Sequence, residues 1–374
     1  MPTSKERVLA ALNHSEPDRV PLDIGGTNCT TMHVTIEKKL KKYLGFEDKG
    51  SEIKSINQQV VIPDETILRH FGSDTRSIYV AEQPWKHDET TGLYIDQWGI
   101  GYQENPDGNY FNFYTHPLAT AQTPEDLEKY QFFEPSEASL DGLEERIKAY
   151  KDEYCLVLEG FKEPLFGVPS WLRGAADFYM DIASDDGLGA ALLDRVLEHY
   201  LKWTGFVLSR IGKYIDVVKV ADDLGTQENL MLSPKLYRKM IKPRQAILYQ
   251  HIKEQCRCKL LLHACGAIRS IIPDLIEIGV DAINPVQITA RGMDPDQLKT
   301  EFGNQMTFWG GDVDTQHTLP FASAVEVKRM VKKNLEVFKP GGGHVFAQVH
   351  NITPDVPVEN IIAMYEAYSE YAGY

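Results

Sequence analysis

The sequence predicts an α/β protein with the fold of a (β/α)8 TIM barrel, and three observations support this prediction. Eight short apolar or β-branched runs recur along the chain, and amphipathic stretches lie between most of them. This alternation of strands and helices is typical of a parallel barrel. No repeat or linker divides the 374 residues, so we expect one domain over residues 1–374.

The expected strands follow one another along the chain as short, mainly apolar runs. They cover residues 19–25 (RVPLDIG), 75–81 (TRSIYVA), 154–160 (YCLVLEG), 216–222 (DVVKVAD), 259–265 (KLLLHAC), 281–285 (DAINP), 306–311 (MTFWGG) and 344–350 (HVFAQVH). Helical periodicity predicts helices over residues 186–211, 233–255, 266–278, 322–338 and 357–371. These helices lie between the strands or after the last one, as the connections of a barrel require.

Residues 83–140 interrupt the alternation and are expected to form an insertion near the barrel mouth. Within it, TGLYIDQWGIGYQENPDGNYFNFYTHP contains two alternating, aromatic runs around NPDGN. Such a pattern predicts a β-hairpin. Two roles remain open for the insertion: a solvated excursion, or a lid that shapes a substrate pocket.

Composition excludes several classes of protein. A hydrophobic fraction of 43% and a charged fraction of 25% are those of a globular protein, and a formal net charge of -15 argues against nucleic-acid binding. No run is long enough to span a bilayer, and MPTSKERVLAAL does not resemble a signal peptide. We therefore expect no membrane partner and a cytoplasmic location.

The five cysteines are few and odd in number, which argues against a disulfide framework and fits a reducing compartment. Cys256 and Cys258 have the spacing of a metal knuckle, but they precede a predicted strand. That is the end of a barrel strand where residues serve stability rather than chemistry. We therefore favour a structural role for these two residues.

Polar side chains follow most of the predicted strands, at the end where barrels carry their chemistry. In chain order they are Asp23 and Asn28, Glu159, Asp222 and Asp223, His263 and Cys265, Asn284 and Gln287, Asp312, and His350. For any single Asp or Asn, capping of the next helix is an equally good explanation. A one-residue shift in strand register decides whether Asp222 or Asp223 faces the pocket.

His263, Cys265 and His350 form the strongest candidate set and predict a metal site. Residues two apart in a strand point the same way, so His263 and Cys265 aim at one point if the strand continues through Cys265. Imidazole and thiolate ligands suit zinc, and a catalytic zinc takes three protein ligands and one open position. Asp223 or Glu159 could be a fourth ligand or support a ligand imidazole. The alternative for each histidine is a hydrogen-bonded core residue.

The chain resembles the uroporphyrinogen decarboxylase superfamily essentially from end to end. The resemblance is carried by ERVLAALNHSEPDRVPLDIGG, ADDLGTQENLMLSPKLYRKMIKP, LLHACG, GVDAINPVQ, MTFWGGDVDTQ and PGGGHVFAQVHNITPDVPVENI. It implies a (β/α)8 barrel, in agreement with the eight runs counted above.

Within that superfamily the chain is more similar to the cobalamin-dependent methyltransferases than to the decarboxylases. The decarboxylases carry an arginine-rich RQAGR signature where this chain has GGTNCTT. The methyltransferases hold zinc with an H-x-C motif and a later cysteine. His263 and Cys265 match H-x-C, and His350 stands where the later cysteine would fall. The resemblance therefore implies bound Zn²⁺ and a corrinoid carried by a separate partner protein.

We therefore expect a zinc-dependent methyltransferase that moves a methyl group between a small methylated substrate and the cobalt of a corrinoid protein. Aryl methyl ethers are candidate substrates, and Trp98, Tyr110 and Phe113 of the insertion would suit a flat molecule unless they only pack the lid. Asp223 or Glu159 would supply a proton to the leaving oxygen if burial raises its pKa. The expected substrate-binding residues are Asp23, Asn28, Asp222, Asn284, Gln287 and Asp312.

Two alternative functions remain. A cofactor-free decarboxylase of a small carboxylated compound would need no metal and one arginine for the carboxylate, for which Arg173, Arg269 and Arg291 are the candidates. A non-catalytic module that binds a tetrapyrrole or a corrinoid protein would bind tightly without turnover.

Overall fold

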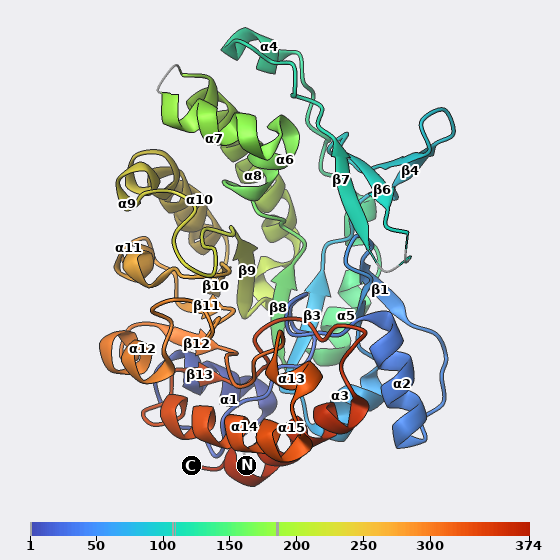
Figure 1. The fold of residues 1–374 in the computed structure, drawn as a ribbon, viewed down its shortest axis with the longest axis vertical. Helices are drawn as coiled ribbons and strands as arrows, with labels where there is room; N and C mark the ends of the chain where they lie inside the picture. Colours follow the sequence, from blue (N-terminus) through green and yellow to red (C-terminus); the bar gives the residue numbers. More distant parts are fainter. Residues whose placement is uncertain (1, 107, 109, 185–186) are drawn as a thin grey trace.

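Seven parallel strands form one curled sheet at the centre of the computed structural model, which describes residues 2–106, 108, 110–184 and 187–374 (Figure 1). Their order in the sheet, β13-β12-β11-β10-β9-β8-β3, follows the chain order. The strands are β3 (Thr75–Tyr79), β8 (Cys155–Glu159), β9 (Val217–Ala221), β10 (Lys259–His263), β11 (Ala282–Asn284), β12 (Thr307–Trp309) and β13 (His344–Val345).

The first predicted strand, residues 19–25, lies between β13 and β3 and completes the ring. Leu22 forms a parallel bridge with Phe346, and the Asp23 N–H donates to the Phe346 carbonyl (2.9 Å). On the other side the Asp74 N–H donates to the Leu22 carbonyl (2.8 Å). The bonds are too few for a regular strand, but all eight predicted segments take their places in the barrel. The predicted fold class is confirmed.

The observed strands are shorter than the apolar runs that predicted them. Strand β10 ends at His263, and β13 ends at Val345, well before His350. The prediction that these two strands extend to Cys265 and His350 was wrong. The physical reason at Cys265 is that its N–H donates to the Asp223 carboxylate (2.9 Å) and not to a neighbouring strand.

Helices cover the outside of the sheet (Figure 1). The predicted helices appear as α8 (Leu188–Ile211), α10 (Lys242–Gln255), α11 (Ile272–Glu277), α14 (Ala324–Phe338) and α15 (Val358–Tyr371). The predicted start of the first of these, residue 186, lies outside the described residues. Before α10 the chain forms a short helix, α9 (Pro234–Leu236), and a π-helical turn over Tyr237–Ile241.

The other α-helices connect the remaining elements. They are α1 (Ser4–Leu12), α2 (Val34–Leu44), α3 (Glu65–Phe71), α4 (Pro124–Glu128), α5 (Leu143–Tyr150), α6 (Gly167–Arg173), α7 (Ala175–Ser184), α12 (Pro295–Phe302) and α13 (Thr318–Phe321). Among the described residues, no helix combines the length and the apolar character that a membrane crossing requires.

A buried apolar cluster fills the inside of the barrel and separates its two ends. It combines strand residues with two residues of α1, and its members are Val8, Leu12, Cys155, Val157, Val217, Leu261, Ala282, Trp309 and Val345. Helix α1 therefore closes the end of the barrel where the strands begin. The opposite end, where the strands finish, is left for polar side chains.

The insertion forms a separate antiparallel sheet beyond the carboxyl ends of β3 and β8 (Figure 1). Its strands, in order, are β4 (Lys86–Asp88), β5 (Leu93–Ile95), β6 (Gly101–Glu104) and β7 (Phe111–Thr115). Strands β6 and β7 are the hairpin predicted around NPDGN, of which residues 107 and 109 lie outside the described residues. A second hairpin, β1 (Glu52–Ser55) and β2 (Val60–Ile62), lies before β3 in the chain.

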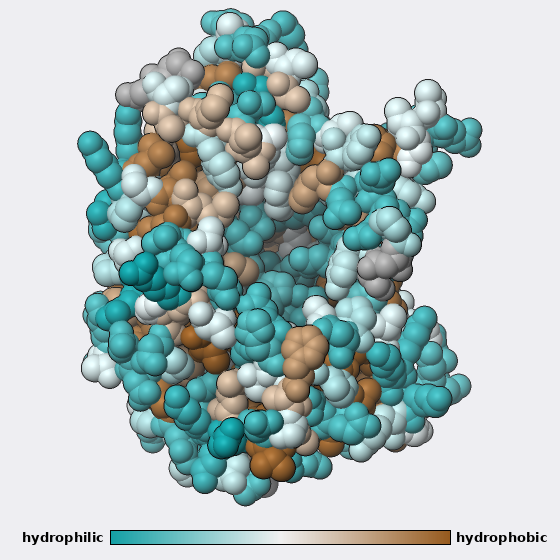
Figure 2. Space-filling model, in the orientation of Figure 1, coloured by the Kyte–Doolittle hydropathy of each residue, from teal (hydrophilic) through white to brown (hydrophobic). Residues whose placement is uncertain are grey.

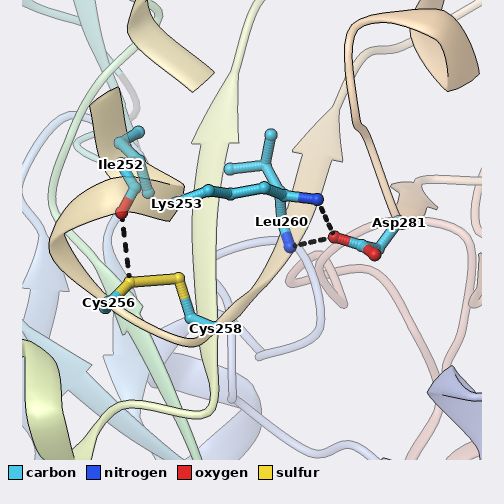
Figure 3. The surroundings of a disulfide bond; sticks show 6 residues. All are labelled: Ile252, Lys253, Cys256, Cys258, Leu260 and Asp281. Atoms are coloured by element: carbon cyan, nitrogen blue, oxygen red, sulfur yellow. Dashed lines mark hydrogen bonds and ion pairs between the residues drawn. A yellow bond between two sulfur atoms is a disulfide. The ribbon is translucent and has the colours of Figure 1, made fainter. Parts of the chain in front are cut away.

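A disulfide, which the cysteine count did not lead us to expect, joins Cys256 and Cys258 (S–S 2.21 Å; Figure 3). It closes a short loop between α10 and β10 and ties no distant elements together. The other cysteines, Cys29, Cys155 and Cys265, are free thiols. The cysteine count argued against a disulfide framework, and this single bond between near neighbours gives the two residues a structural place away from the strand ends.

Candidate metal and substrate site

A cavity of about 550 Å³ opens at the carboxyl ends of the barrel strands. The molecular surface is hollowed between the insertion and the barrel (Figure 2). Residues from the first loop, the β1–β2 hairpin, the insertion and the ends of β3, β8, β9 and β10 line it. This volume is in the range of pockets that bind small molecules.

Two thiols and two imidazoles meet beside the cavity. Cys29 Sγ lies 3.7 Å from His263 Nε2, and Cys265 Sγ lies 3.4 Å from the same nitrogen. The His350 ring centroid is 5.7 Å from that of His263. Ligand atoms of Cys29, His263 and His350 all lie within 4.8 Å of one another, as do those of Asp223, His263 and Cys265.

Cys29 is the member of this cluster that sequence reasoning missed. Beyond the strand ends, the first and last loops run side by side: Met32 bridges Ile352, and the Ile352 N–H donates to the Thr31 carbonyl (3.0 Å). This pairing carries Cys29 to His350 from the other end of the chain. A signal was present, because the first and last strands of a closed barrel are neighbours, so the loops that follow them lie close together.

The cluster favours an ionised Cys29 thiol and charged imidazoles. Burial alone would raise the pKa of the Cys29 thiol, but the imidazoles of His263 and His350 lower it to about 5. Burial would lower the pKa of the two imidazoles, and the thiols raise it well above its ordinary value. A divalent cation replaces such protons when thiolate and imidazole become ligands. The donor set, soft sulfur and nitrogen with one carboxylate nearby, fits zinc.

Asn284 does not line the cavity but hydrogen-bonds with His263, one of the candidate metal ligands. Its Oδ1 lies 3.0 Å from His263 Nδ1, and its Nδ2 donates to the Trp309 carbonyl (2.9 Å). A hydrogen bond to one ring nitrogen fixes the tautomer and leaves the other nitrogen free to bind a metal. On His263 that free atom is Nε2, which faces both thiols.

Of the two adjacent aspartates, Asp223 lines the cavity and Asp222 does not. The Asp223 carboxylate lies 3.4 Å from His263 Nε2. Burial would raise the Asp223 pKa, but the hydrogen bond and charge of His263, together with the hydrogen bonds from Cys265, lower it. Asp222 is fully buried and accepts the N–H groups of Leu165 (2.9 Å) and Phe166 (2.7 Å) ahead of α6. Its role is therefore to hold the loop after β8.

Three further predicted site residues also lie outside the cavity lining. Asp23 accepts hydrogen bonds from Thr75 Oγ1 (2.5 Å) and Trp309 Nε1 (2.7 Å) inside the barrel. Asp312 is fully buried and contacts His344 Nε2 (3.1 Å).

The third, Gln287, joins two loops at the rim of the barrel. Its Oε1 accepts the N–H of Gly266 (2.8 Å), and its Nε2 donates to Gln227 Oε1 (2.5 Å). Because Gly266 directly follows Cys265, this bond orders the loop that carries the Cys265 thiol.

Glu159 and Asn28 do line the cavity, next to Lys54 and Lys219. Lys54 forms an ion pair with Glu159 (2.5 Å), and Lys219 lies 3.5 Å from the same carboxylate and donates to Asn28 Oδ1 (2.8 Å). Burial would raise the Glu159 pKa, but the two lysines lower it. The condition for proton donation by Glu159, a raised pKa, is therefore not met; Asp223 fails it as well.

Glu163 is a cavity carboxyl that sequence reasoning did not single out. Burial, with the neighbouring charges of Asp223 and Asp222, raises its pKa well above the ordinary value. Its Oε2 accepts the Asp223 N–H (3.3 Å). A carboxyl in this position keeps its proton at a pH where an exposed glutamate has lost it.

Aromatic side chains form much of the cavity wall, and two of them, Tyr102 and Phe113, come from the insertion. The Phe113 and Trp171 rings stack with centroids 5.2 Å apart. Trp98, by contrast, is 1% exposed and packs in the core, and Tyr110 does not belong to the lining. The insertion thus shapes the pocket through Phe113, while Trp98 serves packing.

The described cavity lining contains no arginine. Arg173, a candidate for a decarboxylase, is buried against Asp181 (2.8 Å) and the Leu118 carbonyl (3.0 Å). Arg269 pairs with Glu301 at the surface (2.6 Å). The site therefore offers no support for carboxylate binding by these two arginines.

The chain is similar to a known protein family, to two methyltransferases and to a solved structure. The family model "Uroporphyrinogen decarboxylase (URO-D)" matches residues 114–371. The methylcobamide:CoM methyltransferase MtaA of Methanosarcina barkeri is 26% identical over 156 residues, and MtaA of its strain Fusaro / DSM 804 is 22% identical over 156 residues. Each alignment spans 42% of this chain and 42% of the relative, less than half of either.

A solved structure, a methyltransferase from Methanosarcina mazei, superposes on 99% of this chain and 99% of its own. The TM-score is 0.68 at 19% sequence identity. The likeness shows that the two proteins share a fold.

Proposed function

The chain belongs to the uroporphyrinogen decarboxylase family, and we propose that it is a zinc-dependent methyltransferase that moves a methyl group between a small methylated substrate and the cobalt of a corrinoid protein. The observation that carries this proposal is the cluster of Cys29, His263, Cys265 and His350 beside the cavity. The similarity to proteins named for methylcobamide and CoM supports the choice of chemistry.

We assign the metal to Cys29, His263, Cys265 and His350, with Asp223 as a further ligand or as a partner of the His263 ring. When bound, zinc supplies Lewis-acid chemistry toward the oxygen or sulfur that carries or receives the methyl group. The protein's own contribution is to hold the ligands in place before the metal arrives. The buried amide of Asn284 and the paired first and last loops do this.

Glu163 is the residue that we assign to proton transfer. In demethylation of an aryl methyl ether, the bond between the methyl carbon and the oxygen would break and the oxygen would keep its electron pair. The reduced corrinoid of the partner would supply the electron pair for the new bond to the methyl group. The oxygen then needs a proton, and a neutral carboxyl beside the cavity can donate one. Glu163 has a raised pKa, whereas the pKa values of Asp223 and Glu159 are lowered.

The aromatic wall supports a flat substrate. Tyr102, Phe113 and Trp171 line the cavity, and offset or edge contacts with such rings favour an aryl group over an aliphatic one. An aryl methyl ether therefore suits the volume, the wall and the proton donor together.

Two measurements test the proposal. Metal analysis of the purified protein should find zinc, which His263→Ala loses and His317→Ala, a control at an exposed histidine, retains. Zinc-loaded protein mixed with a methoxyarene and a reduced corrinoid protein should change the cobalt spectrum to that of the methylated form. Zinc-loaded protein that produces no methylated corrinoid from any methyl donor would contradict the methyltransferase assignment.

A further inference from the structure

His350 is followed directly by a second polar side chain that contacts its ring. The Asn351 amide oxygen, Oδ1, hydrogen-bonds with His350 Nδ1. Asn351 is 7% exposed, although asparagine side chains mostly lie at protein surfaces. Because a buried amide loses its hydrogen bonds to water, it needs a partner inside the protein. That partner is the imidazole of a candidate metal ligand.

The backbone is held in place on both sides of this pair. Before it, the Val349 N–H donates to the Val313 carbonyl (3.0 Å) in the loop after β12. After it, the Ile352 N–H donates to the Thr31 carbonyl (3.0 Å), and the Ile352 carbonyl accepts the His33 N–H (2.9 Å). The two residues between these anchors therefore have a fixed backbone, and the side-chain hydrogen bond fixes the remaining freedom of the ring.

The other imidazole of the cluster is held by the same kind of contact. Asn284 Oδ1 lies 3.0 Å from His263 Nδ1, and His263 Nε2 lies 3.4 Å from Cys265 Sγ. The two rings stand at 65° to each other, with centroids 5.7 Å apart. In both rings Nδ1 meets an amide oxygen, so Nε2 is the nitrogen that remains for a metal.

Building on the proposed metal site, we propose that Asn351 is a positioning residue, which holds the His350 ring in the orientation and tautomer that present Nε2 to zinc. A metal takes the lone pair of one ring nitrogen, so the proton of the bound imidazole is on the other, and that N–H needs an acceptor. The Asn351 amide oxygen is such an acceptor. Asn351 is not itself among the candidate ligands and acts through His350. Without it, the ring is free to turn and its buried N–H loses its acceptor.

Competition between the protein and a chromophoric zinc chelator at neutral pH tests this assignment. Asn351→Leu keeps the branched shape of the side chain but removes the acceptor, and it should weaken zinc binding by about 10–100-fold. Asn351→Asp keeps an oxygen in the same place, and it should bind zinc at least as tightly as the wild type. The matched control is Asn360→Leu, which should bind zinc as the wild type does. Asn360 is also buried (4% exposed), but its amide donates to the Leu319 and Ala322 carbonyls (both 2.9 Å) and not to a histidine of the cluster.

A second measurement separates positioning of the ligand from a general loss of structure. The absorption spectrum of Co²⁺ bound in place of zinc depends on the geometry of its ligands. We expect the cobalt spectrum of Asn351→Leu to differ from that of the wild type and the spectrum of Asn351→Asp to match it. The circular dichroism spectrum of the protein should be the same in all three. If the leucine variant does not fold, Asn351→Ala, which also removes the acceptor, takes its place.

Two outcomes would overturn the role of Asn351 alone: wild-type zinc affinity and an unchanged cobalt spectrum in Asn351→Leu, or a loss of affinity in Asn351→Asp as large as that in Asn351→Leu. Wild-type protein that binds no zinc would refute the proposed metal site together with this role. The titration needs neither a corrinoid nor a methyl donor. Zinc affinity that depends on Asn351 in a protein without methyl transfer would therefore refute only the proposed reaction.

Discussion

Replacing Cys29 by serine is the most direct test of the metal site. The Cys29 thiol has its pKa lowered to about 5 by the two imidazoles, so it is ionised at neutral pH, whereas a serine hydroxyl is not. The substitution keeps the size of the side chain and removes one ligand. Zinc sites with four protein ligands bind with about 10–16 kcal/mol, so one ligand contributes roughly 3 kcal/mol, a loss of more than about a hundredfold in affinity.

Competition with a chromophoric zinc chelator at neutral pH measures this loss. Cys155→Ser is the matched control, since Cys155 is also a fully buried free thiol but lies at the start of β8, away from the cluster. We expect Cys155→Ser to bind zinc as the wild type does. An affinity of Cys29→Ser within about threefold of wild type would refute the assignment of Cys29 as a ligand, because that difference is well under 1 kcal/mol.

Three further predictions concern two groups around the cavity and a buried histidine of α8. Asn284→Ala should weaken zinc binding about 10–100-fold, because the His263 ring loses the bond that orients it; unchanged affinity would show that packing alone holds the ring. Glu163→Gln should slow methyl transfer by a factor of about 10²–10⁴. In wild-type protein the rate should fall as pH rises through the raised Glu163 pKa, and a variant with the same pH profile would remove Glu163 from the mechanism. Burial lowers the pKa of His199 to about 4, while an unfolded histidine titrates near about 6.5. The free energy of unfolding should therefore fall as the pH drops from about 6.5 to about 4, and urea titrations should show a smaller fall in His199→Leu. An equal fall in both proteins would show that the titration of His199 is not its cause.

The barrel strands were predictable because parallel strands are buried on both faces and appear in the sequence as continuous apolar runs. The ends of the strands were not predictable, because each apolar run in the sequence continues beyond the last residue that hydrogen-bonds to a neighbouring strand. At Cys265 the change comes from the Asp223 carboxylate, which takes the N–H that a longer strand would give to its neighbour. That hydrogen bond joins the loops after β9 and β10, so the sequence around Cys265 alone does not indicate it.

Some residues of the candidate site were also predictable from the sequence, and others were not. His263 and Cys265 were predictable because two residues of one short segment carry the signal. Asp222 and Asp223 differ by one position, and only the fold shows that the second lines the cavity while the first holds the loop before α6. Lys54 belongs to a hairpin outside the barrel alternation, so its ion pair with Glu159 depends on packing that no run of residues reveals.

The metal cluster lies across the seam where the barrel closes. Cys29 follows the first strand segment and His350 follows the last, while His263 belongs to β10 on another side of the ring. The first and last segments are joined by two isolated bridges, Leu22–Phe346 and Met32–Ile352, and not by a regular strand pairing. A metal bound by all three residues would thus join elements that few backbone bonds hold, and metal binding energy would add to the stability of the closed barrel. Zinc should accordingly raise the melting temperature of wild-type protein well above that of Cys29→Ser, and equal shifts in both proteins would mean that the seam closes without help from the metal.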